Sequence, residues 1–213
     1  MDIILFGMQG SGKGTQGKLL ANTFGFTIFE MGGALRHMIA SGTELGNKVK
    51  ATVEAGQLVS DEIIMQVVEA FLSEQPKDQS ILFDGIPRTM HQATELLKLL
   101  QTHGREAYGL HITLTEKEAI DRLTKRRICV NCKTVHPGFY EGDKCSECGG
   151  ELVTRSDDTN LDSIQTRLDS FRKETVPVIE MFRQKNHLFE VDGQQDIEVV
   201  TEQMGKRVEA LLS

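Results

Sequence analysis

The sequence of 213 residues has no tryptophan, only two tyrosines and no excess of positive charge. Its 24 lysines and arginines are outnumbered by 31 aspartates and glutamates, which gives a net charge of −7. Nonspecific binding to nucleic acid or to an anionic membrane depends on a basic surface, and stacking on single-stranded bases depends on aromatic side chains. We therefore expect neither nucleic acid nor a membrane among the partners.

Long apolar runs are lacking too. No segment approaches the roughly 20 apolar residues that cross a bilayer. The run at residues 3–6 is too short for a secretory signal and has no basic region before it. We therefore expect a cytoplasmic protein, with a monomer as the default. Apolar residues still make up 39% of the chain, enough for one substantial domain with a small insertion.

Cysteine is scarce and confined to one segment. The four cysteines form two Cys-x₂-Cys pairs, Cys129 with Cys132 and Cys145 with Cys148. This spacing is typical of a tetrahedral zinc site, while two local disulfides are the alternative, disfavoured in a reducing cytosol. Four sulfur ligands leave no open position for catalysis. Such a site would stabilise a segment with little core of its own.

Five short apolar runs predict buried strands, at residues 3–6, 26–29, 81–83, 110–114 and 187–191. Segments with helical spacing separate them, which predicts an α/β fold with a doubly wound, five-stranded parallel sheet.

Two of the intervening segments are longer than a crossover needs, and they predict excursions at residues 30–80 and 125–160. A third, helical segment carries an apolar stripe from Ile164 to Phe182. Pro177 should kink this helix or open it locally, because it lacks a backbone N–H.

A glycine-rich segment follows the first predicted strand and leads into a helical pattern. It reads Gly7-Met8-Gln9-Gly10-Ser11-Gly12-Lys13-Gly14-Thr15. Strand, glycine-rich loop and helix in this order are typical of a phosphate-binding loop, whose backbone N–H groups surround an anion. Lys13 can reach the terminal phosphates, and the hydroxyl stands at Thr15 because Gly14 follows the lysine. A plain glycine-rich turn is the alternative.

The Gly-Lys-Gly-Thr form of this loop resembles that of the adenylate kinase family, which are nucleoside monophosphate kinases. Further matches follow in the family's order along nearly the whole chain, including residues 41–46, 55–59, 83–89, 154–155, 157–158 and 191–193. The cysteine segment resembles the zinc-bearing lid of the family's long-lid form, with a shorter loop between the cysteine pairs.

The resemblance implies Mg²⁺-dependent phosphoryl transfer from ATP to AMP, giving two ADP, on a fold of the P-loop NTPase type. It also implies a helical AMP-binding region at residues 30–59 and a zinc-binding lid at 125–160. The core would comprise residues 1–29, 60–124 and 161–213.

Transfer of a phosphoryl group needs positioned cations more than a protein nucleophile, and arginine binds phosphate oxygens in a bidentate manner. The resemblance implies these catalytic residues: Lys13, Asp84, Arg88, Arg126, Arg155 and Arg167. Asp84 ends a predicted strand, where an acid can orient Mg²⁺ or its waters; a turn-forming aspartate is the alternative. Arg167 lies at the edge of its helix's apolar stripe, which predicts that it faces the cleft.

Two sets of nucleotide contacts follow from the resemblance. Those expected for ATP are Gly10, Ser11, Gly12, Lys13, Gly14, Thr15, Arg122, Arg126, Thr134, Val135 and Gln195. Those expected for AMP are Met31, Arg36, Gln57, Leu58, Val59, Gly85, Ile86, Pro87, Arg88, Gln92, Arg155 and Arg167, with Gln92 reading the adenine edge.

Two positions depart from the family pattern. Met31 stands where a threonine or serine is usual, and Gly33 stands where an aspartate is usual. Methionine cannot supply the hydroxyl's hydrogen bond to the base, which gives the hypothesis of a relaxed or shifted acceptor specificity. The alternative is that Met31 is a packing substitution.

An alternative function of a different class is that of a P-loop ATPase whose four-cysteine ribbon binds nucleic acid. Residues 125–155 carry six basic side chains against four acidic ones, a weak patch on an acidic protein.

Overall fold

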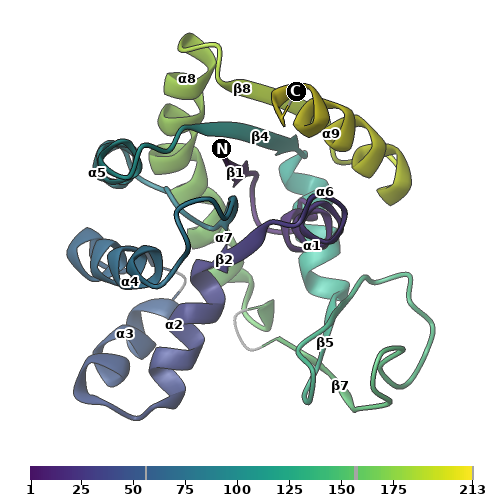
Figure 1. The fold of residues 1–213 in the computed structure, drawn as a ribbon. Helices are drawn as coiled ribbons and strands as arrows, with labels where there is room; N and C mark the ends of the chain where they lie inside the picture. Colours follow the sequence, from purple (N-terminus) through teal and green to yellow (C-terminus); the bar gives the residue numbers. More distant parts are fainter. Residues whose placement is uncertain (56, 156–157, 213) are drawn as a thin grey trace.

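The computed structural model describes residues 1–55, 57–155 and 158–212. Within them, a five-stranded sheet has the order β2-β3-β1-β4-β8, and every neighbouring pair is parallel (Figure 1). The strands are β1 (Asp2–Phe6), β2 (Thr27–Glu30), β3 (Ile81–Asp84), β4 (Ala107–Thr113) and β8 (Leu188–Asp192). Each contains most of one predicted run, so the predicted α/β class and five-stranded parallel sheet are confirmed.

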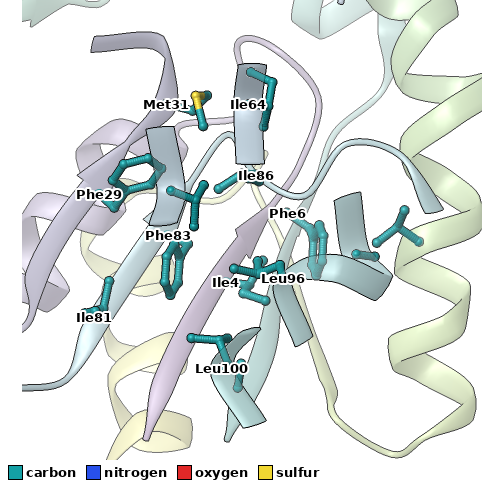
Figure 2. Packing of buried hydrophobic residues seen from close by; sticks show 14 of the residues in the cluster. Ile4, Phe6, Phe29, Met31, Ile64, Ile81, Phe83, Ile86, Leu96 and Leu100 are labelled. Carbon is teal, nitrogen blue, oxygen red and sulfur yellow. The ribbon is translucent and has the colours of Figure 1, made fainter. Parts of the chain in front are cut away.

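Helices cover both faces of this sheet, because successive side chains of a buried strand point to opposite sides. Ile3 and Leu5 pack against α1 (Lys13–Phe24) and α9 (Ile197–Leu212). Ile4 and Phe6 belong to the other layer, shown in Figure 2, which α4, α5 and α8 cover. These helices are α4 (Asp61–Ser73), α5 (Met90–Thr102) and α8 (Val176–Gln184).

The helical stripe that contains Pro177 is broken as predicted. Helix α7 (Leu161–Ser170) leads into a π-helical turn at Phe171–Thr175, and α8 follows, with Pro177 in its first turn. The N–H of Val176 bonds to the carbonyl of Phe171, five residues back. Proline cannot donate to the ladder, and the wider turn accommodates it.

Both long excursions leave the sheet near the carboxyl ends of its strands. After β2 come α2 (Met31–Ala40) and α3 (Glu44–Glu54), at the lower left of Figure 1. After β4, helix α6 (Glu116–Lys125) leads to a small antiparallel sheet at the lower right. Its strands are β5 (Arg127–Cys129), β6 (Val135–His136) and β7 (Leu152–Thr154).

None of the helices in the described part of the chain is long and apolar enough to cross a membrane.

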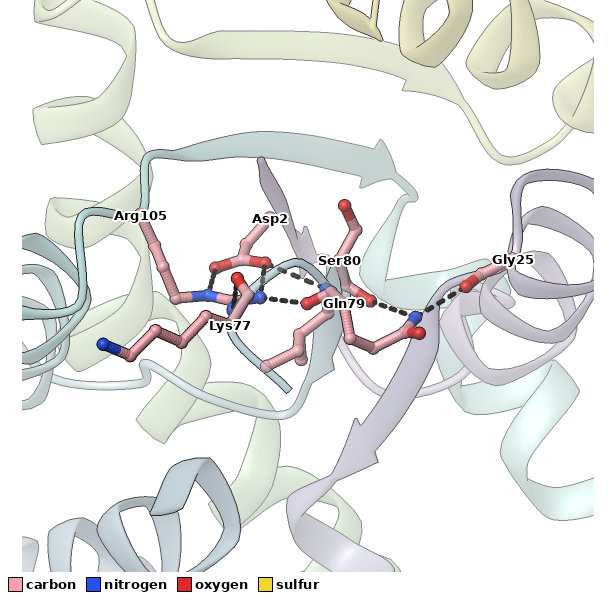
Figure 3. Close-up of polar contacts among 7 residues, drawn as sticks. Asp2, Gly25, Lys77, Gln79, Ser80 and Arg105 are labelled. Carbon is pink, nitrogen blue, oxygen red and sulfur yellow. Dashed lines mark hydrogen bonds and ion pairs between the residues drawn. The ribbon is translucent and has the colours of Figure 1, made fainter. Parts of the chain in front are cut away.

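The amino ends of the strands are fastened by a buried ion pair (Figure 3). The carboxylate of Asp2, at the start of β1, accepts two hydrogen bonds from Arg105, one from Nε at 2.7 Å and one from Nη2 at 2.6 Å. The backbone N–H of Ile81 also donates to Asp2, at 2.9 Å. Arg105 further donates to the carbonyls of Lys77 and Gln79, which ties the chain before β3 to β1.

Candidate active site

The phosphate loop predicted from the sequence connects β1 directly to α1. Gly10 and Gly12 have φ angles of 85° and 97°, in the left-handed region that side chains rarely adopt. In this part of the chain no side chain caps the start of α1. The first backbone N–H groups of the helix and the positive end of its dipole therefore suit an anion.

Lys13 lies at the head of α1 and folds back over the loop. Its Nζ donates to the carbonyls of Gly7 at 2.6 Å and Met8 at 3.0 Å. Burial lowers the pKa of Lys13 from 10.5 to about 8, an effect that the carboxylate of Asp84 opposes. The nearby guanidinium groups of Arg88 and Arg126 lower this pKa further.

Asp84 is the last residue of β3 and faces the loop. Burial raises its pKa, the charge of Lys13 opposes the rise, and Glu30, opposite it on β2, adds to it. A Cβ on Gly14 would stand 3.9 Å from Asp84 Oδ2, so the first turn of α1 runs close to this carboxylate. Carboxylate and hydroxyl oxygens are ligands that Mg²⁺ prefers, and Asp84 with Thr15 in the same turn offers both.

Arg88 follows the turn after β3. Its Nε donates to the carbonyl of Gly85 at 3.0 Å, and its own carbonyl accepts the Thr175 hydroxyl at 3.0 Å. Burial lowers the pKa of Arg88, Asp84 opposes this, and the charges of Arg167 and Arg155 lower it further. The predicted catalytic cations thus lie close enough to influence one another.

Two of these cations share one buried carboxylate. Asp158 Oδ2 accepts the Nε of Arg126 at 2.5 Å, and its Oδ1 accepts the Nη2 of Arg167 at 2.8 Å. Arg167 is 7% exposed and Asp158 4% exposed. The backbone N–H of Asp158 also bonds to the carbonyl of Arg155, at 2.9 Å. Sequence reasoning did not include Asp158 in the site, although it lies in the matched segment 157–158.

Some matched positions fall outside the described residues. These are Gly56, within the match at 55–59, and Asp157, within the match at 157–158.

Among the residues predicted for the acceptor, Gln92 lies beside Arg88. Its Oε1 accepts the Arg88 N–H at 2.7 Å, and its Nε2 donates to Asp61 Oδ1 at 2.7 Å. Asp61 is a second residue that sequence reasoning missed, since no local pattern pairs residues 31 positions apart.

Other predicted AMP contacts lie around this turn. Arg36 forms an ion pair with Glu30 at 2.8 Å. Leu58 and Val59 line a cavity of about 200 Å³, and Gln57 beside them is exposed. Ile86 is buried next to Pro87, after Gly85.

Met31, a predicted AMP contact, lies at the start of α2. It is 1% exposed and belongs to the core layer, where Figure 2 shows it near Phe29 and Ile64. This burial favours the packing interpretation of Met31.

Among the residues predicted to contact ATP, Arg122 and Gln195 are brought to one turn. Arg122 donates from Nη2 to the carbonyl of Gly193 at 2.9 Å, and Gln195 donates to the carbonyl of Asp192 at 3.0 Å. A Cβ on Gly193 would lie 2.6 Å from Ile112 and 3.2 Å from the carbonyl of Ser11, so only glycine permits this approach to the phosphate loop.

The two predicted lid contacts of ATP lie next to the cysteines. The carbonyl of Thr134 accepts the N–H of Cys129 at 3.0 Å, and Thr134 Oγ1 lies 3.2 Å from Cys132 Sγ. Val135 is exposed on β6.

The four cysteines converge as the spacing predicts. Their sulfur atoms all lie within 4.8 Å of one another, with Cys129 and Cys148 at 3.4 Å and Cys132 and Cys145 at 3.5 Å. A tetrahedral ion with Zn–S bonds of about 2.3 Å has sulfur separations of about 3.8 Å. The set therefore fits zinc. His136, also buried, places its Nε2 3.3 Å from Cys145 Sγ.

Comparison with known proteins agrees with this geometry. The adenylate kinase family profile matches residues 5–187. An adenylate kinase of Archaeoglobus fulgidus is 36% identical over 217 residues, covering 100% of this chain and 98% of that protein. One from Geobacillus sp. (strain WCH70) is 38% identical, covering 94% of each chain. One from Desulforudis audaxviator is 39% identical, covering 96% of this chain and 97% of its own. The chain therefore belongs to the adenylate kinase family of enzymes.

Proposed function

We propose that this adenylate kinase transfers the γ-phosphoryl group of ATP to AMP, reversibly and with Mg²⁺, giving two ADP. The observation that carries the proposal is the grouping of buried and half-buried cations at the carboxyl edge of the sheet. Lys13, Arg88 and Asp84 shift one another's pKa values, and Arg126, Arg155 and Arg167 contribute to the same field. A partly buried excess of positive charge suits the phosphates of two nucleotides meeting there.

The donor nucleotide would be held by the phosphate loop. The backbone N–H groups of residues 10–15 would surround its β-phosphate, and Lys13 would exchange its bonds to the Gly7 and Met8 carbonyls for the terminal phosphates. The turn at residues 192–195, with Arg122, would border the ribose and base, and the lid backbone at Thr134 and Val135 would cover the base.

Mg²⁺ is the cofactor that the family implies, and the donor set at Asp84 and Thr15 fits it. When bound, it would neutralise charge on the β- and γ-phosphate oxygens. Asp84 would hold it through its carboxylate or through waters. Zn²⁺ would be the lid's structural ion, held by Cys129, Cys132, Cys145 and Cys148.

The acceptor would enter from the side of α2 and α3. Arg36 and Arg88 would bind the phosphate of AMP, and Gln92 would read its base. An oxygen of that phosphate would attack the γ-phosphorus in line, forming the new P–O bond as the bond to the β-phosphate oxygen breaks. Arg126, Arg155 and Arg167 would stabilise the charge on the transferred group, while Asp158 holds two of them in place.

We assign the excursions at 30–59 and 125–160 as the acceptor-side and donor-side covers of a core formed by 1–29, 60–124 and 161–213. Their closure would exclude water, which otherwise accepts the phosphoryl group.

The second candidate keeps the chemistry and relaxes the acceptor base. Gly32 and Gly33 border the Glu30–Arg36 ion pair, and a Cβ on Gly33 would stand 3.1 Å from Glu30 Oε2. The usual aspartate is thus replaced by glycine beside a carboxylate from β2. A preference for AMP above about 1,000-fold, roughly 4 kcal/mol, would exclude a relaxed acceptor site.

One coupled assay tests both candidates. ADP formation from Mg-ATP is measured with AMP, CMP, UMP and GMP in the absence of nucleic acid, and values of kcat/KM are compared. Formation of two ADP for each AMP consumed supports the proposal. ATP hydrolysis that leaves AMP unchanged and needs an oligonucleotide would instead support a nucleic-acid-dependent ATPase.

A further inference from the structure

The side-chain amide of Gln92 is held at both ends by different elements. The group that faces the Arg88 N–H must be its oxygen, and the group that faces the Asp61 carboxylate must be its NH₂, since each partner accepts only one assignment. Both distances are 2.7 Å, and Gln92 is 2% exposed. In a flipped amide the NH₂ group would face the Arg88 N–H and the oxygen would face the Asp61 carboxylate, so both buried hydrogen bonds would be lost.

Asp61 is itself fixed at the start of α4. Its Oδ2 accepts the hydroxyl of Thr89 at 3.0 Å, and His91 Nδ1 lies 3.1 Å from the same oxygen. Thr89 also caps α5 by accepting the Gln92 N–H at 3.1 Å. The carboxylate therefore joins the first turns of α4 and α5, and Gln92 cannot turn without breaking this junction.

The held amide keeps a fixed hydrogen-bonding pattern. Among the described residues, its second N–H and second oxygen lone pair have no further partner. An amide in this orientation presents one donor and one acceptor in set positions. The edge of adenine, with an acceptor at N1 and an amino donor at C6, is complementary to it, whereas a base with N1–H and a C6 carbonyl presents the reverse.

We propose that Asp61 is a specificity-determining positioning residue, which fixes the Gln92 amide so that an acceptor with an amino group is preferred over one with a carbonyl at the same position. The inference rests on the proposed function, in which Gln92 reads the acceptor base. Asp61 acts only through Gln92 and touches neither substrate.

The test compares AMP with inosine monophosphate, which differs only at N1 and C6 of the base. Asp61→Asn can accept a hydrogen bond from Gln92 or donate one to it, so it permits the flipped amide. The ratio of kcat/KM for AMP to that for inosine monophosphate should fall about tenfold, since one of two restraints is lost. Asp61→Ser, whose hydroxyl can also donate or accept, should lower the ratio in the same direction.

Two controls separate specificity from stability. Glu62→Gln removes an exposed charge from the same helical turn and should leave the ratio unchanged. In a Gln92→Ala background, Asp61→Asn should no longer change the ratio, because its effect passes through the amide.

The outcomes distinguish the inference from its basis. A folded Asp61→Asn or Asp61→Ser variant with the wild-type ratio overturns the role of Asp61. A Gln92→Ala variant with the wild-type ratio overturns the assignment of Gln92 as base reader, and with it this inference, while AMP-dependent ADP formation by the wild type would leave the catalytic proposal intact. Absence of that activity would overturn the proposed function itself.

Discussion

Two charged clusters lie at opposite ends of the same parallel sheet, one buried and the other half-buried. At the amino ends, Asp2 and Arg105 are balanced in charge, and both oxygens of the carboxylate are bonded (Figure 3). At the carboxyl ends, Lys13 and Arg88 are half-buried among several other cations, and their pKa values are lowered, while the pKa of Asp84 is raised.

This difference in charge balance indicates that the cluster at the amino ends stabilises the fold, whereas the cluster at the carboxyl ends binds substrate. A balanced and fully hydrogen-bonded pair has its charges satisfied in the free protein. In an unbalanced cluster the charged forms of the side chains are disfavoured until a group of opposite charge binds. In this enzyme we assign that counter-charge to the phosphates of the substrates.

The largest effect is expected at Lys13. Lys13→Met should lower kcat about 1,000-fold, because it removes a preorganised cation from the transferred phosphoryl group. Since this cation is unbalanced, the free energy of unfolding should stay the same or rise. Steady-state kinetics and urea unfolding measure both quantities. Lys18→Met, an exposed lysine on the same helix, is the matched control. A fall in kcat of less than tenfold would contradict the assignment of Lys13.

The amino-end cluster should respond in the opposite way. Arg105→Met leaves the carboxylate of Asp2 buried and unpaired, which should lower the free energy of unfolding by about 3–5 kcal/mol. Where the variant is folded, kcat should be unchanged. Lys206→Met, which breaks a solvent-exposed pair with Glu202, should leave the free energy of unfolding nearly unchanged. A large loss of kcat in Arg105→Met without loss of stability would break the comparison.

The four cysteines of the lid form a third cluster, in which we expect a zinc ion to balance the charge of the sulfur ligands. Removing zinc with a chelator should destabilise the lid by about 2.7 kcal/mol relative to zinc at 100 times its Kd. Hydrogen exchange should accelerate in β5–β7 and remain slow in β1 and β3. Zinc content near one ion per chain, lost in Cys148→Ser, is the accompanying measurement. Exchange that is insensitive to the chelator, or a protein that holds no zinc, would refute a structural zinc site.

The smallest effect concerns pH. Lys13 has a folded-state pKa of about 8, below its ordinary 10.5, so it loses its charge as the pH rises through about 8. We expect kcat/KM for ATP to fall about tenfold per pH unit above this value.

Stability should change in the other direction over the same range. Between pH values of about 8 and 10.5, the unfolded chain binds more protons at this lysine than the folded chain does. The contribution of Lys13 to stability therefore rises with pH in this range. Urea midpoints of the wild type and of Lys13→Met isolate this contribution. An identical pH dependence in the two proteins would contradict it.

The sequence predicted what depends on local pattern. Apolar runs predicted the five strands of the parallel sheet, the glycine-rich loop predicted a helix directly after it, and cysteine spacing predicted the four-cysteine cluster. Pro177 predicted the opening between α7 and α8 because its missing N–H acts locally.

What the sequence did not reveal depends on tertiary contact. Asp2 meets Arg105 across 103 positions, and Asp61 meets Gln92 across 31. Nothing local distinguishes these aspartates from exposed ones, since their partners are chosen by the strand order and helix packing. At Met31 the family resemblance left a base contact and a packing role open, and the burial of its side chain in the core favours packing.

The most direct test of the account is the titration of Lys13 by ¹³C NMR of its Cε, assigned with the Lys13→Met variant. In the free enzyme the midpoint should lie at about 8, and it should move upward when Mg-ATP is added, since the phosphates supply the missing negative charge. A midpoint near 10.5 in the free enzyme, or one that ATP leaves unchanged, would contradict the claim that this cluster is completed by its substrate.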